Sequence, residues 1–462
     1  MPDLSAIFKA YDIRGVVPDQ LDEDLSRRIG AAFAAVQNLA ADDGRVAVGH
    51  DMRESSEPLA RAFAEGLTES GVDVVDIGLA STDELYFASG ALDAAGAMFT
   101  ASHNPAQYNG IKLCRPGAAP VGKESGLAEI QELVESGENA QRPTQPAGDR
   151  PPGNVERRDM LGEYAAHLHK LVPVTGRRLK VVVDAGNGMG GHTVPAVFAD
   201  LDVELVPLYF ELDGSFPNHE ANPIEPANLA DLQRKVVEVG ADVGLAFDGD
   251  ADRCFLVDER GEIVTPSALT ALIAVRELER DPGATVIHNL ITSRAVPEIV
   301  RKHGGNPVRS RVGHSYIKGT MAETGAIFGG EHSGHFYFRD FWRADSGMLA
   351  ALHALAALAA TDAGTTLSSL LADYSPYAAS GEINSTVDDQ DAALARIEQE
   401  YAGRQGVTVD HLDGLTVEHD DWWFNVRASN TEPLLRLNAE GVEVSDMTAV
   451  RDDVLKLIRS SS

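Results

Sequence analysis

Cysteine is scarce in this chain of 462 residues, which contains only Cys114 and Cys254. The two lie far apart, and neither spacing is typical of a zinc site, so a disulfide scaffold is excluded and a reducing cytoplasm is expected. The first residues show no basic segment followed by an apolar core, so we expect no secretory signal. Long hydrophobic runs are also missing. The longest, residues 348–360, is too short to cross a bilayer and predicts a buried helix.

Basic residues are outnumbered, because 39 Lys and Arg stand against 71 Asp and Glu and leave a net charge of −32. Such a chain repels nucleic-acid backbones and anionic membrane surfaces, so we expect neither as a partner. A small anionic substrate would need local basic clusters. The content of 44% hydrophobic and 24% charged residues excludes a disordered or collagen-like chain. At about 150 residues per domain, the length allows roughly three domains.

Strand and helix patterns alternate along most of the chain, as in βαβ units with mixed or parallel sheets. Apolar runs predict strands at 45–48, 72–77, 97–99, 179–183, 203–208, 243–247, 285–287 and 327–328. Amphipathic spacing predicts helices at 57–69, 229–239 and 295–303. A stretch rich in Pro and Gly, residues 141–158, is interpreted as a linker that ends the first domain. Beyond residue 376 the pattern changes to a smaller α+β arrangement, with helices at 391–401 and 446–458 and strands at 406–409, 415–418 and 422–427.

Ligands of open α/β sheets bind beyond the carboxyl ends of the strands, so polar loops at those ends are candidate sites. The loop after 97–99 carries Ser102, a nucleophile that needs a base or a metal to react. The loop after 243–247 carries Asp248, Asp250 and Asp252, whose alternate spacing lets three carboxylates converge on a hard cation such as Mg²⁺. The plain alternatives are a hydrogen-bonded turn at Ser102 and a solvated acidic turn at the aspartates.

Two further loops carry polar residues that suit a phosphorylated sugar. Glu331 and Ser333 alternate in the loop after 327–328, and together they could bind two neighbouring hydroxyls. Residues 427–433 concentrate Arg, Ser, Asn and Thr, whose donors suit a phosphate dianion. A polar loop with hydrogen-bonded histidines and a strand-to-helix cap are the plain alternatives.

Two patterns favour other functions. Gly186, Gly188 and Gly191 fit G-x-G-x-x-G, and Glu211 follows about 20 residues on, as in nicotinamide-dependent oxidoreductases. A glycine-rich turn between strand and helix explains that match equally well. Glu259 falls at the twelfth position counted from Asp248, as in an EF-hand. The sixth position there is an arginine, where the calcium loop needs glycine, and the flanks resemble strands, so we set the EF-hand aside.

Taken together, the four loops resemble those of the α-D-phosphohexomutase superfamily, in the family's order and over essentially the whole chain. Residues 100–105 resemble its phosphoserine loop, 248–253 its metal loop, 331–335 its sugar-recognition loop and 427–431 its phosphate-binding loop. The segment 8–15, Thr100 and the Glu-His-Ser-Gly-His loop are most similar to bacterial phosphomannomutase/phosphoglucomutase. Phosphoglucosamine mutases typically have Gln where this chain has His332.

The resemblance implies an α/β fold in which three similar α/β domains with mixed sheets and a C-terminal α+β domain surround a central cleft. We expect the domains at 1–150 with the phosphoserine loop, 151–255 with the metal loop, 256–372 with the sugar-recognition loop and 373–462 with the phosphate-binding loop.

The resemblance also implies reversible phosphoryl transfer between the 1- and 6-positions of a hexose phosphate, through a phosphoserine and a hexose 1,6-bisphosphate. The expected catalytic residues are Ser102, His103, Arg14, Lys112 and Arg253. The expected ligands of Mg²⁺ are Ser102, Asp248, Asp250 and Asp252. The expected substrate-binding residues are Tyr11, His314, Glu331, Ser333, His335, Arg427, Ser429, Asn430 and Thr431.

Several alternatives stay open at this point. The expected sugar contacts do not touch the 2-hydroxyl, so mannose and glucose phosphates both remain candidate substrates. A phosphoglucosamine mutase, an oxidoreductase that uses the 186–191 loop and a non-catalytic calcium- or sugar-binding protein are the other functions considered. A monomer and a dimer are equally compatible with the sequence. Some homologues place a Lys within the segment 289–292, and this chain has none there.

Overall fold

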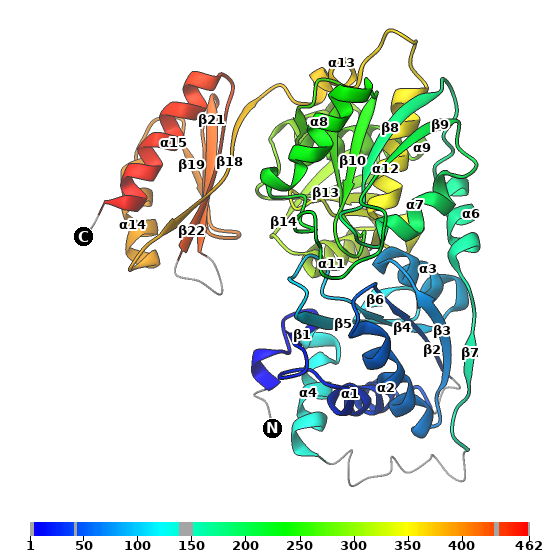
Figure 1. The fold of residues 1–462 in the computed structure, drawn as a ribbon. Helices are drawn as coiled ribbons and strands as arrows, with labels where there is room; N and C mark the ends of the chain where they lie inside the picture. Colours follow the sequence, from blue (N-terminus) through cyan, green and yellow to red (C-terminus); the bar gives the residue numbers. More distant parts are fainter. Residues whose placement is uncertain (1–3, 41–43, 138–150, 429–433, 461–462) are drawn as a thin grey trace. The chain divides into compact units, whose positions relative to one another are not determined.

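The computed structural model describes residues 4–40, 44–137, 151–428 and 434–460 (Figure 1). The chain forms two compact units. The first unit combines Met1–Val264 with Ser333–Leu370, and the second combines Thr265–His332 with Leu371–Ser462. Within the described ranges, no helix has both the length and the apolar character needed to span a membrane.

The first unit contains a seven-stranded sheet in the order β1-β5-β4-β2-β3-β7, with β6 paired to β5. Its strands are β1 (Ile13–Val16), β2 (Arg45–His50), β3 (Asp73–Leu79), β4 (Ala95–Phe99), β5 (Tyr108–Arg115), β6 (Ala119–Pro120) and β7 (Val155–Arg157). Strands β2, β3, β4 and β7 run parallel, whereas β1 and β5 are antiparallel to their neighbours. Because β2 and β4 are parallel neighbours, the loops that follow them lie at the same edge of the sheet.

Four helices accompany this sheet: α1 (Glu23–Val36), α2 (Ser56–Glu69), α3 (Thr82–Leu92) and α4 (Leu127–Ser136). Helices α1 and α2 cross in backbone contact at two glycines. A Cβ atom on Gly30 would lie 2.3 Å from the Phe63 carbonyl oxygen, and one on Gly66 would lie 2.0 Å from that of Arg27. Any side chain at either position would therefore push the two helices apart.

A second sheet of the first unit has the order β12-β11-β10-β8-β9. Its strands are β8 (Leu179–Asp184), β9 (Val203–Leu208), β10 (Val243–Phe247), β11 (Cys254–Asp258) and β12 (Ile263–Val264), with helices α6 (Leu161–Leu171), α7 (Gly190–Phe198) and α8 (Ala230–Val239). Strands β10 and β11 form an antiparallel hairpin whose loop carries the three aspartates. The same unit contains β16 (Phe336–Phe338), β17 (Ala344–Asp345) and α12 (Gly347–Ala359), a fully buried helix that contacts β11.

The second unit begins with a parallel arrangement in which β13 pairs with β14 and β15. These strands are β13 (Thr285–Asn289), β14 (Asn306–Ser310) and β15 (Phe328–Gly330), with helices α9 (Pro266–Arg280), α10 (Ala295–Lys302) and α11 (His314–Thr324). Its C-terminal part is an antiparallel sheet in the order β18-β22-β21-β20-β19. That sheet comprises β18 (Ala378–Thr386), β19 (Thr408–Asp410), β20 (Leu415–Glu418), β21 (Trp422–Ala428) and β22 (Leu434–Gly441), with helices α14 (Gln390–Tyr401) and α15 (Val444–Arg459).

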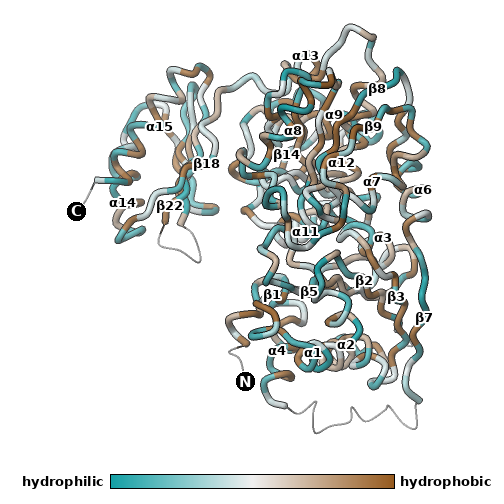
Figure 2. Tube along the Cα trace, in the orientation of Figure 1, coloured by the Kyte–Doolittle hydropathy of each residue, from teal (hydrophilic) through white to brown (hydrophobic). Residues whose placement is uncertain are grey.

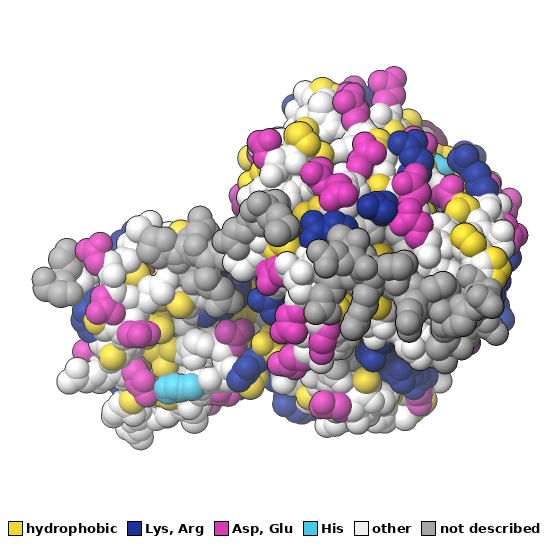
Figure 3. Space-filling view, turned by 90° about the horizontal axis from the view of Figure 1, so that it is seen from below, with side chains coloured by type: hydrophobic (Ala, Val, Ile, Leu, Met, Phe, Trp, Pro, Cys, Tyr) yellow, Lys and Arg dark blue, Asp and Glu magenta, His cyan; other side chains and the backbone are white. Residues whose placement is uncertain are grey.

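Hydropathy explains how these elements pack. Strands β4, β10 and β11 are buried along their whole length, as expected for strands covered on both faces. Helix α15 instead contains both hydrophilic and hydrophobic residues (Figure 2), and one face of it buries Met447, Val450, Val454 and Ile458. Acidic side chains are spread over the visible face in Figure 3 rather than gathered in one patch, in keeping with the net charge of −32.

The predicted linker is wrong in part. Residues 141–158 were expected to be a linker, but Val155–Arg157 form β7, which pairs in parallel with β3. All three residues of β7 are exposed, so no hydrophobic alternation marks them as a strand. Residues 141–150 lie outside the described residues. The mixed sheets and the C-terminal α+β arrangement are confirmed.

Candidate active site

Ser102 lies in the loop between β4 and β5, directly beside the loop that carries the aspartates. Its hydroxyl donates a hydrogen bond of 2.6 Å to Asp248 Oδ2, although 146 positions separate the two residues. Ser102 is 5% exposed and has a φ of +50°, a left-handed conformation that is unusual for serine. Its own N–H donates to Thr100 Oγ1 at 2.9 Å. The candidate nucleophile is thus held in one defined orientation.

The two loops are in backbone contact at Gly249. A Cβ atom built on Gly249 would lie 2.3 Å from the Ser102 carbonyl oxygen and 3.0 Å from its carbon. The metal loop packs in the same way against the glycine-rich loop that follows β8, because a Cβ on Gly188 would lie 2.6 Å from the Gly249 oxygen. A Cβ built on Gly191 would lie 2.2 Å from the Phe210 carbonyl oxygen. Close packing therefore accounts for Gly188 and Gly191, and a φ of +52° accounts for Gly186, the three glycines that suggested an oxidoreductase.

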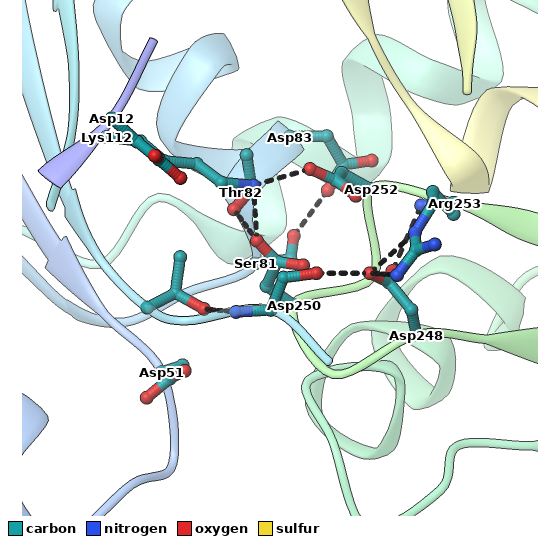
Figure 4. A network of polar contacts seen from close by, with 12 residues as sticks. Asp12, Asp51, Ser81, Thr82, Asp83, Lys112, Asp248, Asp250, Asp252 and Arg253 are labelled. Atoms are coloured by element: carbon teal, nitrogen blue, oxygen red, sulfur yellow. Dashed lines mark hydrogen bonds and ion pairs between the residues drawn. The ribbon is translucent and has the colours of Figure 1, made fainter. Parts of the chain in front are cut away.

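The carboxylates of Asp248, Asp250 and Asp252 converge between β10 and β11 (Figure 4). One ligand atom from each lies within 4.8 Å of the other two, and all three side chains are buried. Asp250 Oδ1 and Asp252 Oδ1 have no hydrogen-bond partner among the described residues. Thr82, at the start of α3, donates its hydroxyl to Asp250 Oδ2 at 2.5 Å. Buried oxygens with unused lone pairs are the donor set that a hard divalent cation prefers.

Two cations partly balance these three carboxylates. Lys112 Nζ lies 2.7 Å from Asp250 Oδ2 and from Asp252 Oδ2, and Arg253 Nε donates to Asp248 Oδ2 at 2.9 Å. Burial raises the pKa of Asp248, with Arg253 opposing the rise. Burial opposes ionisation of Asp250 too, but the Lys112 ammonium holds the pKa of Asp250 below its usual range. Because two cations face three carboxylates, the cluster keeps an excess negative charge that suits a metal ion.

His103 also lies beside the Ser102 hydroxyl, and Arg253 binds His103. His103 Nδ1 lies 3.2 Å from Ser102 Oγ and accepts a hydrogen bond of 2.5 Å from the Arg253 guanidinium. Burial, reinforced by Arg253 and Arg14, lowers the pKa of His103 to about 2. The imidazole is therefore neutral at physiological pH, and its Nδ1 atom is an acceptor.

The structure brings other expected residues to the same unit. Arg14 donates to Asn104 Oδ1 and to Asp12 Oδ2, both at 2.6 Å, which ties β1 to the Ser102 loop. His335 Nε2 lies 3.6 Å from Asp252 Oδ1, and His335 also forms a backbone bridge with Arg253. The hydroxyl of Ser333 lies 2.9 Å from His335 Nδ1. Tyr11 is partly buried just before β1.

The remaining expected residues lie in the second unit or outside the described residues. The carboxylate of Glu331 is buried and accepts from the Gly313 N–H at 3.0 Å, next to the start of α11. Arg427 is the penultimate residue of β21, where its guanidinium lies 3.6 Å from Glu382 and its buried Nε has no hydrogen-bond partner among the described residues. His314 is the first residue of α11, but its side chain lies outside the description, as do Ser429, Asn430 and Thr431.

The sequence analysis missed three residues that shape this site. Thr82 contacts the aspartate cluster, Gly249 sets the spacing of two loops, and Arg53 binds the backbone of the Ser102 loop. Arg53 had a detectable signal, because it closely follows β2 at the sheet edge that also carries Ser102. Thr82 had the same signal, because it closely follows β3, which is parallel to β2, and Gly249 lies within the predicted 248–253 loop. Their specific contacts, however, join distant segments that local patterns do not connect.

Comparisons with known proteins agree over the whole chain. Sequence profiles described as phosphoglucomutase/phosphomannomutase α/β/α domains I, II and III match residues 5–141, 162–261 and 265–377, and the profile of the C-terminal domain matches 382–457. A phosphomannomutase of Salmonella montevideo is 41% identical over 462 residues, covering 98% of this chain and 99% of the relative. A protein named phosphohexose mutases, from Xanthomonas campestris pv. campestris, is 44% identical over 436 residues and covers 94% of each chain.

A solved structure supports the same assignment. The crystal structure of a phosphoglucomutase/phosphomannomutase family protein from Burkholderia thailandensis superposes with a TM-score of 0.87 at 34% identity, over 100% of this chain and 99% of that one. Fold and site together define a member of the α-D-phosphohexomutase superfamily. Within it, the chain belongs to the phosphoglucomutase/phosphomannomutase family.

The predicted enzyme class is thereby confirmed: the protein is a phosphohexomutase that transfers a phosphoryl group within a hexose phosphate. The expected architecture of three α/β domains and a C-terminal domain is confirmed as well. This family assignment excludes the two alternative functions, an oxidoreductase and a non-catalytic binding protein. The domain boundaries at 150, 255 and 372 stay predictions, as do the roles of the individual site residues.

Proposed function

We propose that this chain interconverts the 1- and 6-phosphates of mannose, and also of glucose, through a phosphoserine at Ser102 and a hexose 1,6-bisphosphate. The observation that carries the proposal is the 2.6 Å hydrogen bond from Ser102 Oγ to Asp248 Oδ2, beside a buried cluster of three carboxylates. The names of the relatives, phosphomannomutase and phosphohexose mutases, support a phosphorylated hexose as substrate.

Asp248, Asp250 and Asp252 would hold Mg²⁺, together with an oxygen of phosphorylated Ser102. Asp250 Oδ1 and Asp252 Oδ1, which accept no hydrogen bond from the described residues, support this assignment. When bound, the ion would neutralise charge on the phosphoryl oxygens, which is most of what phosphoryl transfer requires of a catalyst.

The chain's own residues supply position, positive charge and a route for one proton. A hydroxyl oxygen of the sugar forms a bond to phosphorus, the bond from phosphorus to Ser102 Oγ breaks, and the electron pair stays on Oγ. Arg14, Lys112 and Arg253 would neutralise the transferring group. His103, neutral because burial holds its pKa at about 2, would accept the hydroxyl proton only transiently and pass it to Ser102 Oγ, which lies 3.2 Å from His103 Nδ1. The reverse transfer then returns the other phosphate to Ser102.

Substrate recognition must serve two opposite orientations of the bisphosphate. Glu331 and Ser333 would bind the 3- and 4-hydroxyls, which are alike in glucose and mannose. The non-reacting phosphate and the rest of the sugar would contact Arg427, Ser429, Asn430, Thr431, Tyr11, His314 and His335. The central cleft, the cytoplasmic location and the choice between monomer and dimer stay predictions.

The decisive experiment compares Ser102→Ala with the wild type after incubation with a hexose 1,6-bisphosphate. In the wild type, intact mass should rise by one phosphoryl group, and a coupled assay should show turnover of mannose 1-phosphate. In Ser102→Ala both should disappear, while calorimetry still detects hexose-phosphate binding. Ser70→Ala is the matched control, because Ser70 is a buried serine outside the site whose hydroxyl donates to the Gly66 carbonyl in α2. Full turnover in Ser102→Ala would refute the proposal.

Substrate choice is measured in the same assay. Mannose 1-phosphate, glucose 1-phosphate and glucosamine 1-phosphate are compared by kcat/KM. Since His332 stands where phosphoglucosamine mutases typically have Gln, we expect the amino sugar to be the poorest of the three. A preference for glucosamine 1-phosphate would replace the proposed substrate with the alternative kept open above.

A further inference from the structure

Arg53 makes an unusual set of contacts with the backbone of the Ser102 loop. It lies just beyond β2 and is only 3% exposed. One terminal nitrogen of its guanidinium donates to the carbonyl oxygens of Ser102 (2.8 Å) and Asn104 (2.6 Å). The other donates to those of Pro105 (2.9 Å) and Tyr108 (3.0 Å). A single side chain thus holds four carbonyl groups between positions 102 and 108.

Arg53 is itself held by two residues, Asp51 and Phe216. Its Nε lies 3.2 Å from Asp51 Oδ2, and its backbone N–H donates to Asp51 Oδ1 at 3.0 Å. Asp51 also accepts from Ser56 Oγ at 2.5 Å, at the start of α2. The guanidinium stacks over the ring of Phe216 at 5.2 Å, in the loop region after β9. The Arg53 guanidinium therefore has little freedom to rotate. The carbonyl groups that it binds are thus fixed relative to β2 and α2.

The Ser102 loop needs such support, because its local conformation is unfavourable by itself. Ser102 has a φ of +50°, and a non-glycine residue persists in that region only where its surroundings enforce it. The Ser102 carbonyl is also confined from the other side by Gly249, since a Cβ there would approach it to 2.3 Å. Arg53 and Gly249 thus define where the Ser102 backbone can lie, and hence where its hydroxyl meets Asp248.

We propose that Arg53 is the positioning residue of the phosphoryl carrier: it holds the 102–108 backbone so that Ser102 Oγ faces the Asp248 cluster in both half-reactions. The proposal rests on the proposed role of Ser102. Arg53 does not touch the reacting atoms, and its effect is exerted through the carbonyl groups. Lysine cannot replace it, because one ammonium offers three donors on a single nitrogen, whereas the planar guanidinium serves separate acceptors on both arms.

The first test is Arg53→Lys, which keeps the charge opposite Asp51. Displacing the reacting serine by about 1 Å should lower kcat about 100-fold. The KM for the hexose phosphate should change little, because the residues proposed to bind the sugar lie elsewhere. Arg177→Lys is the matched control, because Arg177 also bridges a carboxylate, that of Asp242, and a backbone carbonyl, that of Thr365, outside the site. It should lower thermal stability and leave kcat unchanged.

The second test is chemical rescue. A cavity of about 270 Å³, lined by Arg53, Glu54, Gln107 and Asp213 among others, borders this position. In Arg53→Ala, millimolar guanidinium ion should restore part of kcat, and methylammonium should not. If Arg53→Ala does not fold, as circular dichroism would reveal, Arg53→Lys decides alone.

These outcomes separate the inference from the proposed function. If the wild type shows no mutase turnover or no phosphorylation of Ser102, the proposed function is wrong. If the wild type is active and Arg53→Lys keeps wild-type kcat, the positioning role is wrong. The positioning role is also wrong if both Arg53 variants show a lower kcat, a higher KM and a lower thermal stability together, and guanidinium restores no kcat in Arg53→Ala.

Discussion

Replacing Gly249 by alanine adds one methyl group at the contact between the metal loop and the Ser102 loop. The backbone of Gly249 does not adopt a positive φ, so alanine itself is conformationally acceptable there. The cost is steric, because the new Cβ would lie 2.3 Å from the Ser102 carbonyl oxygen. That atom belongs to the backbone and is also bound by Arg53, so it cannot simply rotate away.

The size of the effect follows from that distance. Ordinary contact begins at 3.4 Å, so the two loops must separate by the difference from 2.3 Å, which is about 1.1 Å. A displacement of this size between a nucleophile and its partners costs about 100-fold in rate, or about 2.7 kcal/mol in activation free energy. Overpacking a close contact also costs about 1–3 kcal/mol of folding stability. We therefore expect Gly249→Ala to be folded and nearly inactive.

The assay measures kcat for mannose 1-phosphate together with thermal unfolding. Gly162→Ala is the control, because Gly162 lies in α6 and a Cβ there meets no atom within 4 Å. The same chemical change should leave kcat unchanged and add about 0.5–1 kcal/mol of stability, since alanine favours a helix over glycine. Wild-type kcat in Gly249→Ala would refute the argument that contact between these loops sets the position of Ser102.

Three further predictions concern the metal cluster, a buried acid and the helix crossing. A divalent cation at about 100 times its Kd should raise the free energy of unfolding of the wild type by about 2.7 kcal/mol, which thermal unfolding detects as a higher Tm. Asp250→Asn should lose most of this cation-dependent increase in Tm. Burial raises the pKa of Glu84 to about 8 from 4.5, so its contribution to stability is present below pH 4.5 and is lost as pH rises through 8. As pH rises from 4.5 to 8, the free energy of unfolding of Glu84→Gln should therefore increase by about 5 kcal/mol relative to that of the wild type. Urea titrations at both pH values measure this difference. Gly66→Ala should lower unfolding free energy by about 1–3 kcal/mol, because its Cβ would lie 2.0 Å from the Arg27 carbonyl.

Each of these has an opposing outcome. An Asp250→Asn variant that keeps the full cation-dependent shift would show that the ion binds elsewhere. A constant stability difference between Glu84→Gln and the wild type from pH 4.5 to 8 would show that Glu84 ionises normally in the folded protein. Unchanged stability in Gly66→Ala would show that α1 and α2 can separate at no cost. Gly162→Ala again serves as the control for the last comparison.

Most strands and helices could be predicted where hydrophobic periodicity is strong. The strands at 179–183, 203–208 and 243–247 correspond to β8, β9 and β10, and the apolar run at 348–360 is the buried helix α12. Strand β7 escaped prediction because an exposed edge strand carries no such periodicity. The candidate nucleophile and the three aspartates could be found because each follows a buried strand.

The sequence by itself determined the residue types of the site, because the chemistry of phosphoryl transfer requires a hydroxyl, a hard-cation cage and cationic donors, each with a recognisable local pattern. Only the tertiary structure decided which of these groups meet. Ser102 and Asp248 lie 146 positions apart. The contacts of Lys112 and Thr82 with Asp250, and of Arg53 with the Ser102 carbonyl, likewise depend on how strands are ordered in two sheets. The physical reason is that local periodicity encodes single elements, whereas the distance between loops depends on backbone packing, here on a glycine that leaves room for one carbonyl oxygen.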